Sequence, residues 1–193
     1  ERTDVRDRYE GANRKVFALN MMVDSYVLEP LASAYRDTVP EGGQTAVSNH
    51  LRWASLPSTA VNSTLQGKFE NAALATLHFL VNGLTLGFAD LATDEEEQIT
   101  KEDFGQTLAS WNVPEGSYHM GPVLGPRTTR SLGGTVVDFT LNPLSVFGSG
   151  DVVQTVNAAQ APVGAVSFRA QNYDAINDVK YNSLDPYART RSI

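Results

Sequence analysis

The sequence contains no cysteine and has no excess of basic residues, and each shortage excludes a class of protein. Without cysteine there is no disulfide framework, no thiol nucleophile and no cysteine metal site. The net charge of −7 argues against nucleic-acid binding, because lysine and arginine must neutralise phosphates. The same negative charge disfavours electrostatic docking on anionic lipid. Any membrane contact should therefore be hydrophobic.

Motifs for catalysis and metal binding are also missing. His50, His78 and His119 are scattered without the spacing of zinc ligands. The segment Phe147-Gly148-Ser149-Gly150 lacks the spacing of a nucleophile elbow, and Glu102-Asp103 is better explained by a helix N-terminus than by acid–base catalysis. We therefore predict a protein that is not an enzyme and has no cofactor and no metal.

The chain length suits one domain. Its 193 residues contain no obvious linker, so we expect residues 1–193 to form a single domain with 1–9 as a flexible lead-in. The sequence begins without methionine, and we expect a mature or trimmed form.

Helical patterns occupy most of the sequence. From Asn13 to Leu28 apolar residues cover most of the helix circumference, and Asn13, Asn20 and Asp24 form a narrow polar stripe. An ordinary surface helix has the opposite proportions. Other patterns predict helices around residues 29–35, 45–54, 58–67, 103–111, 128–141, 151–173 with a kink or break near 161, and 186 onward. No β-hairpin signal is persuasive, so the predicted fold is all-α.

Residues 71–89 contain no charged side chain. As one helix they would span roughly the hydrocarbon core of a bilayer. However, His78, Asn82 and Thr85 fall on one face, which a helix surrounded by lipid would not tolerate cheaply. Two interpretations stay open: a buried core helix, or a helix with lipid on one side and a polar cavity on the other.

The segment 102–126 is rich in glycine and proline. It contains four glycines and three prolines among aromatic and apolar residues, which predicts a shaped, non-helical insert rather than a floppy linker. Long connections of this kind within a domain tend to carry function.

Residues spread over most of the chain form a recognisable pattern. They are Glu10-Gly11, Asn13-Arg14, Phe17, Asn20, Asp24, Pro30, Tyr35-Arg36, Val39-Pro40, Val47-Ser48-Asn49, Pro57, Val61-Asn62, Leu65-Gln66-Gly67-Lys68, Phe79-Leu80, Asn82, Gly87, Asp90-Leu91-Ala92, Glu102 to Leu108, Gly116, Tyr118, Pro122, Leu124-Gly125-Pro126, Arg130, Asp138 and Asp185-Pro186-Tyr187. In this order and spacing the chain resembles the MlaA/VacJ lipoproteins of the bacterial outer membrane. It departs from them at His50-Leu51, at His78, at Asn82-Gly83 and at Ser117.

The resemblance implies a fold and a location. It implies a single domain of mostly short amphipathic helices, arranged as a ring around an amphipathic channel, with the Gly/Pro-rich insert at the channel wall or mouth. It also implies an outer-membrane protein in the periplasmic leaflet, held by an N-terminal lipid anchor that precedes Glu1 in the full-length protein.

The resemblance also implies a function. Such proteins remove mislocalised phospholipids from the outer leaflet and deliver them to a periplasmic carrier of the MlaC kind, and they associate with trimeric porins. The alternatives are a porin-associated structural scaffold or, less favoured by the sequence, a membrane-bound lipid hydrolase.

We therefore hypothesise two sets of site residues. Polar residues of the helical stripes would line the lipid channel: Asn20, Asp24, Asn49, Asn62, Gln66, His78 and Asn82. Residues of the insert would form the channel mouth: Gly116, Tyr118, Gly121, Pro122 and Gly125. For each polar residue, a helix cap or a satisfied core hydrogen bond is the alternative interpretation.

Overall fold

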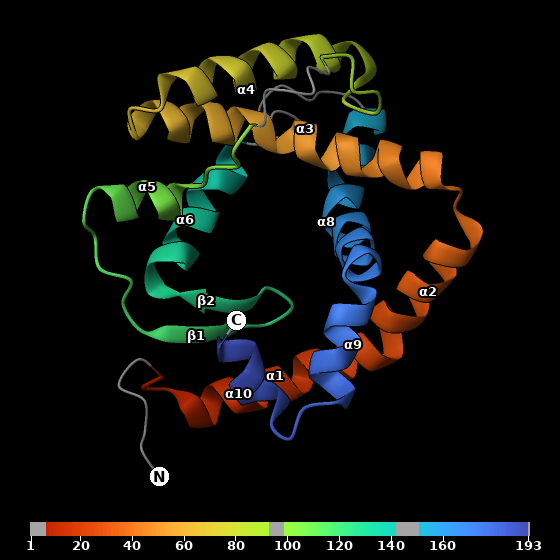
Figure 1. Ribbon diagram of the computed structural model, residues 1–193, viewed down its shortest axis with the longest axis vertical. Coiled ribbons are helices and arrows are strands. Elements are labelled where there is room, and N and C mark those ends of the chain that lie inside the picture. Colours follow the sequence, from red (N-terminus) through yellow and green to blue (C-terminus); the bar gives the residue numbers. More distant parts are fainter. Residues whose placement is uncertain (1–6, 93–98, 142–150, 193) are drawn as a thin grey trace. The chain divides into compact units, whose positions relative to one another are not determined.

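The structure, a computed structural model, describes residues 7–92, 99–141 and 151–192 (Figure 1). The segment Phe147–Gly150 considered above lies outside the described residues. The described chain is mostly helical, as predicted, with one short hairpin. The predicted ring around a channel stays a prediction.

Contacts divide the chain into two compact units. Unit 1 comprises residues 1–40, 115–129 and 163–193, and unit 2 comprises 41–114 and 130–162. The boundary at residue 162 falls within one helix, α8 (Asp151–Gln171), so each unit holds one part of it.

Unit 1 begins with one continuous helical stretch. Helix α1 (Glu10–Val23) passes into a π-helical turn, η1 (Asp24–Leu28), and then into α2 (Glu29–Thr38). The C-terminal part of α8, α9 (Tyr173–Tyr181) and α10 (Pro186–Ser192) complete its helices. Asp185 accepts a hydrogen bond from the Ala188 amide and starts α10, as the Asp-Pro sequence predicts.

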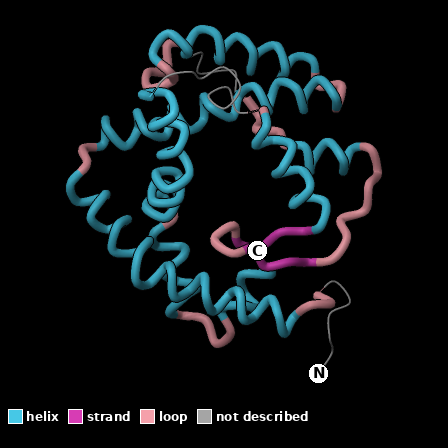
Figure 2. The backbone as a smooth tube through the Cα atoms, turned by 180° about the vertical axis from the view of Figure 1, so that it is seen from behind, coloured by secondary structure: helices cyan, strands magenta, loops and turns pink. Residues whose placement is uncertain are grey.

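Part of the Gly/Pro-rich insert, predicted to be non-helical, forms a β-hairpin that the sequence did not signal. Strands β1 (Tyr118–Gly121) and β2 (Gly125–Thr128) pair antiparallel, and Figure 2 shows them beside the helices of unit 1. Pro126 lies opposite Met120 and cannot donate a ladder hydrogen bond. It is tolerated because both strands of a two-stranded sheet are edges. The short strands and this proline conceal the hairpin in the sequence.

Side chains of α1 hold the hairpin. Asn13 donates to the Tyr118 carbonyl and accepts from the Met120 amide, at 3.2 and 2.9 Å. One heptad later, Asn20 donates to the Gly121 carbonyl and accepts from the Val123 amide, both at 2.9 Å. The predicted polar stripe of this helix therefore binds backbone groups of the insert.

The core of unit 1 is small. Phe17, Met120 and Tyr187 form its buried apolar cluster. Asp7 is also fully buried, and it accepts hydrogen bonds from Asn13, Tyr187 and Arg191. Asp7 belongs to the predicted lead-in of residues 1–9, and its carboxylate is held from three sides.

Unit 2 is built on a helix pair. The long helices α3 (Glu41–Leu65) and α4 (Phe69–Asn82) lie side by side (Figures 1 and 2). Helix α4 is followed by a 3₁₀ turn, η2 (Gly83–Thr85). Helices α5 (Phe104–Ser110) and α6 (Thr129–Thr140) and the N-terminal part of α8 complete the unit.

Two helix boundaries differ from the prediction. Pro57 does not interrupt α3, and Pro162 does not end α8. In α3 the residues around Pro57 are buried against their neighbours, and tertiary packing outweighs the local cost of the proline. At 25 residues, α3 is also longer than the short helices we expected there.

The uncharged segment 71–89 is not one spanning helix. Helix α4 ends at Asn82, and the chain then turns through Leu86 and Gly87, which both have positive φ. A Cβ atom on Gly87 would overlap the Trp53 side chain, so the chain needs glycine here. No helix among the described residues has the length and apolarity that a bilayer crossing requires.

Helices α5 and α6 make a close backbone contact in unit 2. A Cβ atom placed on Gly134 would lie 2.8 Å from the Gly105 Cα. The preceding residue on α6, Gly133, faces open space.

These neighbouring glycines provide a matched test of packing. We expect Gly134→Ala to lower the free energy of unfolding by about 2 kcal/mol, because the methyl group forces α5 away from α6. Gly133→Ala should raise it by about 0.5–1 kcal/mol, because alanine favours the helix. Urea unfolding followed by circular dichroism measures both. Equal effects of the two substitutions would contradict the close contact.

Candidate functional site

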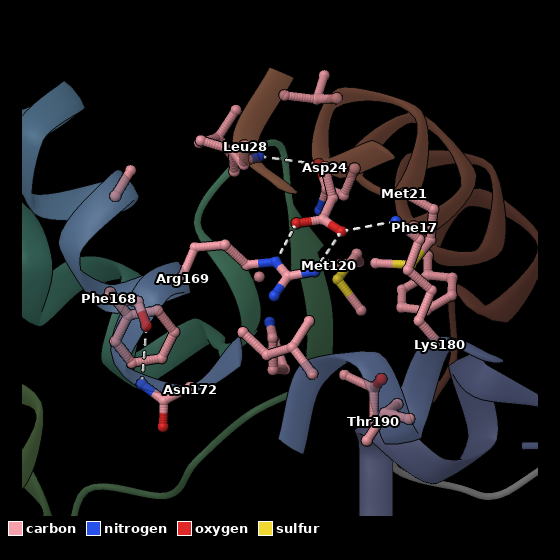
Figure 3. A pocket seen from close by; sticks show the side chains of 18 of the residues that line it. Phe17, Met21, Asp24, Leu28, Met120, Phe168, Arg169, Asn172, Lys180 and Thr190 are labelled. Atoms are coloured by element: carbon pink, nitrogen blue, oxygen red, sulfur yellow. Dashed lines mark hydrogen bonds and ion pairs between the residues drawn. The ribbon is translucent and has the colours of Figure 1, made fainter. Parts of the chain in front are cut away.

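Unit 1 contains a cavity of about 470 Å³, within the range of small-molecule sites (Figure 3). We call it the Asp24 cavity. Its walls come from α1, η1, the hairpin, the C-terminal part of α8, α9 and α10. The lining is mainly apolar and includes Phe17, Met21, Leu28, Met120, Ala165, Phe168, Ile176 and Val179. Such a lining suits hydrocarbon rather than a polar metabolite.

A buried ion cluster lies on one wall of this cavity. Arg169 on α8 donates through Nε to Asp24 Oδ1 at 2.6 Å, and Lys180 on α9 donates to Asp24 Oδ2 at 2.8 Å. Figure 3 shows Arg169 extending toward the Asp24 carboxylate. Asp24 and Arg169 are 5% and 2% exposed, so solvent screens their attraction little.

Further partners complete the cluster. Glu29 accepts from Lys180 at 2.7 Å and from the Tyr181 hydroxyl at 2.8 Å. Arg169 also donates to Asn177 and to the Tyr173 carbonyl. A buried charge is stable only when it is paired and its remaining donors are satisfied, and this cluster meets that condition.

The cluster fixes the charge of its members. Burial alone would raise the pKa of Asp24, but the hydrogen bonds and charges of Arg169 and Lys180 outweigh it and hold the pKa below its ordinary value. Burial would likewise lower the pKa of Lys180, but hydrogen bonds to Asp24 and Glu29 raise it above the usual value. Both groups therefore stay charged at neutral pH.

The hairpin turn borders the same cavity. Val123, Gly125 and Pro126 line it together with Asn20 of α1. Val123 has φ of 64°, which is unusual for a β-branched residue, and the hydrogen bond from its amide to Asn20 helps hold that conformation. The turn is thus positioned by α1, which lines the same cavity.

The structure brings some of the hypothesised site residues together. Asn20, Asp24 and Gly125 line the Asp24 cavity. Gly121 and Pro122 belong to the hairpin and its turn, and Gly116 precedes β1. Tyr118 packs its ring edge-to-face against Tyr187 in the core, and burial raises the pKa of its hydroxyl.

The other hypothesised channel residues lie in unit 2, and most have structural partners. Asn62 is fully buried; it donates to Asp138 and accepts from Thr107, and Gln66 donates to the same Thr107 hydroxyl. Asn82 is buried and binds the segment that follows η2: its amide oxygen accepts from the Leu91 and Ala92 amides.

Two residues of the set remain. Asn49 accepts from Arg52 at 3.2 Å, and His78 is partly buried on α4. Asn62 and Asn82 therefore have the satisfied hydrogen bonds that we gave as the alternative to channel lining.

Sequence reasoning missed Arg169 and Lys180. Arg169 follows the uncharged run 152–168, and Asp24 lies in a similarly uncharged part of α1 and η1. Single charges of opposite sign within apolar runs are a signal of buried pairing. The π-helical turn at Asp24–Leu28 is a second signal, because such turns often mark functional sites, but it is visible only in the structure.

Comparisons with known proteins agree with this architecture. The family model for the MlaA lipoprotein matches residues 5–193. The chain belongs to the MlaA lipoprotein family. An uncharacterised protein of Rickettsia typhi is 32% identical over 196 residues, covering 98% of this chain and 75% of the relative. The Escherichia coli K12 protein, named intermembrane phospholipid transport system lipoprotein MlaA, is 30% identical over 191 residues, covering 96% and 74%.

A solved structure shares the fold of this MlaA-family chain. It comes from work on the structural basis for maintenance of bacterial outer membrane lipid asymmetry. The TM-score is 0.77 at 30% sequence identity, and the match covers 96% of this chain and 94% of the solved one.

The ion cluster predicts a pH-dependent stability. Asp24→Asn should lower the free energy of unfolding by about 3 kcal/mol at pH 7, because it removes one partner of a buried pair. The pKa of Asp24 is lowered in the folded protein, so its contribution is present above the ordinary value of 3.8 and is lost as the pH falls below it. The difference between the two proteins should therefore be constant from pH 7 to 5 and shrink below pH 4.

Urea unfolding over this pH range measures the effect, and an exposed pair supplies the control. Asp178 pairs with Arg189, and both side chains are more than 40% exposed. Asp178→Asn should therefore change stability little. An equally small effect of Asp24→Asn would show that the buried cluster does not hold unit 1 together.

Proposed function

We propose that this chain transports phospholipid without breaking a covalent bond. The observation that carries the proposal is the Asp24 cavity, an apolar space of about 470 Å³ with charged and amide groups on its wall. That combination suits an amphiphile, with hydrocarbon against the apolar lining and a polar part near Asn20, Asn172 and Thr190. The name of the Escherichia coli relative supports the same substrate class.

Exposed apolar side chains support a membrane location. On α4 and η2, Phe69, Leu77, Leu80 and Leu84 are 54–83% exposed and recur at spacings of eight, three and four, so they form one face. Such a face is costly in water and is typical of a helix lying along a membrane interface. In unit 1, Met22, Tyr26 and Leu31 are similarly exposed.

We place the protein at the periplasmic leaflet of the outer membrane, held by an N-terminal lipid anchor of the full-length protein. In this proposal it removes mislocalised phospholipids from the outer leaflet and delivers them to a periplasmic carrier of the MlaC kind, in association with a trimeric porin. Membership of the MlaA family supports this placement. So does the similar solved structure, which comes from work on outer membrane lipid asymmetry.

The proposal needs no nucleophile. Moving a lipid between environments requires a sheltered path for its head group and an apolar wall for its chains. Arg169 and Lys180 are committed to Asp24 and Glu29, so they shape and stiffen the cavity wall rather than act as an acid or a base. The residues around the cavity would bind and orient lipid only.

Filling the cavity tests the proposal. Ala165 lies on α8 and lines the Asp24 cavity, so Ala165→Phe should occupy part of the space for an acyl chain. We expect the detergent-purified variant to retain several-fold less phospholipid than the wild type, measured by native mass spectrometry and lipid extraction. The control Ala34→Phe adds the same side chain at an exposed position on α2 and should retain lipid normally.

Two outcomes would contradict the proposal. Unchanged lipid retention in a folded Ala165→Phe variant would exclude the cavity as the lipid path. Release of fatty acid from bound phospholipid would contradict transport without bond breaking.

A further inference from the structure

Unit 2 contains a second cavity of different character, which we call the Glu102 cavity. It has a volume of about 380 Å³, and its polar lining includes Gln66, Lys68, Glu102, Asp103, Gln106 and Arg130. These residues lie at the C-terminal end of α3, around the start of α5 and on α6. The lining carries two acidic and two basic side chains, so its charge is balanced. The proposed transport does not require a site of this kind at this place.

Glu102, which lines this cavity, has a buried carboxylate oxygen without a hydrogen-bond donor among the described residues. Glu102 is 2% exposed, and its Oε1 accepts from Lys68 Nζ at 2.6 Å. None of the described residues donates to its Oε2, although that atom is shielded from solvent. A buried carboxylate oxygen without a donor is costly, so such an atom calls for a partner.

The chemistry of the surroundings indicates which partner fits. A metal ion prefers several oxygen ligands, whereas here the adjacent Lys68 ammonium disfavours a second small cation of high charge. A primary ammonium group carries three N–H donors and a single charge. It would complete the hydrogen bonding of Oε2 and find further acceptors on Asp103 and Gln66. Lys68 and Arg130 supply positive charge for an anionic group in the same molecule.

Apolar side chains beside the cavity indicate that the ligand is a lipid. Leu65 and Phe69, on either side of the α3–α4 turn that contains Lys68, are 42% and 69% exposed. Trp111 is 50% exposed and lies next to Leu65, because its indole N–H donates to the Leu65 carbonyl. A polar cavity that holds an unpartnered carboxylate oxygen therefore opens beside an exposed apolar surface.

We propose that the Glu102 cavity binds the head group of an amine-bearing phospholipid, with the ammonium on Glu102 and the phosphate toward Lys68 and Arg130. The acyl chains then lie on Leu65, Phe69 and Trp111. The site selects phospholipids that carry a primary amine over anionic ones that lack it. This inference rests on the proposed phospholipid transport, and it names the substrate class that unit 2 prefers.

The central test is Glu102→Gln. Glutamine keeps an oxygen for Lys68, but it removes the charge and places an N–H₂ group where the ammonium would bind. Isothermal titration calorimetry compares dihexanoyl phosphatidylethanolamine with dihexanoyl phosphatidylglycerol, both below their micelle concentrations. All proteins carry Ala165→Phe, which weakens binding in the Asp24 cavity.

We expect the parent protein to bind the ethanolamine lipid at least about tenfold more tightly than the glycerol lipid, and Glu102→Gln to abolish this preference. The matched control is Glu70→Gln, an equal charge change at an exposed position in the first turn of α4, and it should keep the preference. Phosphoethanolamine without acyl chains should bind more weakly than the lipid. Equal affinity would show that a free small molecule is the ligand and would overturn the lipid assignment.

A test without a mutation covers the case in which Glu102→Gln does not fold. Dihexanoyl phosphatidylcholine carries a quaternary ammonium with no N–H donor, so it should bind more weakly than the ethanolamine lipid. Equal affinities for all head groups, or a preference that survives Glu102→Gln, would overturn this inference and leave the transport proposal standing. Absence of phospholipid binding both with and without Ala165→Phe would overturn both.

Discussion

Backbone groups outside helices must find hydrogen-bond partners, and in this chain asparagine side chains on the helices supply them. In unit 1, Asn13 and Asn20 of α1 bind the hairpin through both their carbonyl and amide groups. In unit 2, Asn71 of α4 binds the amide and carbonyl of Thr100, and Asn82 accepts from the amides of Leu91 and Ala92. Asn13 and Asn20 are seven residues apart, and Asn71 and Asn82 are eleven apart, so each pair lies on one face of its helix. The irregular segments are therefore anchored to the regular ones at fixed points.

These asparagine contacts bear on how a polar stripe on a helix is interpreted, because the stripe can face a ligand or the protein's own backbone. A stripe on an apolar helix predicts that polar groups face something other than hydrocarbon, and that prediction holds on α1 and α4. The sequence does not show whether the partner is a ligand or the protein's own backbone. On α1 the partner is the hairpin, and one turn after Asn20 it is the ion cluster of Asp24.

Much of the fold was predictable, since helix patterns, caps and the Asp185-Pro186 start depend on local sequence. The long-range features were not. The continuity of α3 through Pro57 depends on burial by its neighbours, and the hairpin depends on Asn13 and Asn20, more than one hundred residues earlier in the chain. Two of the predicted site residues, Asn20 and Asp24, line a cavity, and their role in lining a lipid channel stays a prediction. Arg169, which neutralises Asp24, lies 145 positions away and has no local pattern that pairs it with that residue.

Polar side chains are often buried in this protein, and large apolar side chains are often exposed. Among the described residues more polar than apolar side chains are buried, while Tyr26, Leu84 and Phe139 are 71–83% exposed. In an ordinary globular protein in water the buried residues are mainly apolar, and burial of apolar surface is the dominant stabilising term. Here hydrogen bonds and ion pairs hold much of the interior, and apolar surface is left for an external partner. Lipid is the partner that such a surface fits, because it removes apolar groups from water without requiring a specific shape. In the transport that we propose, a lipid chain enters the cavity at little cost, since it leaves one apolar surface for another.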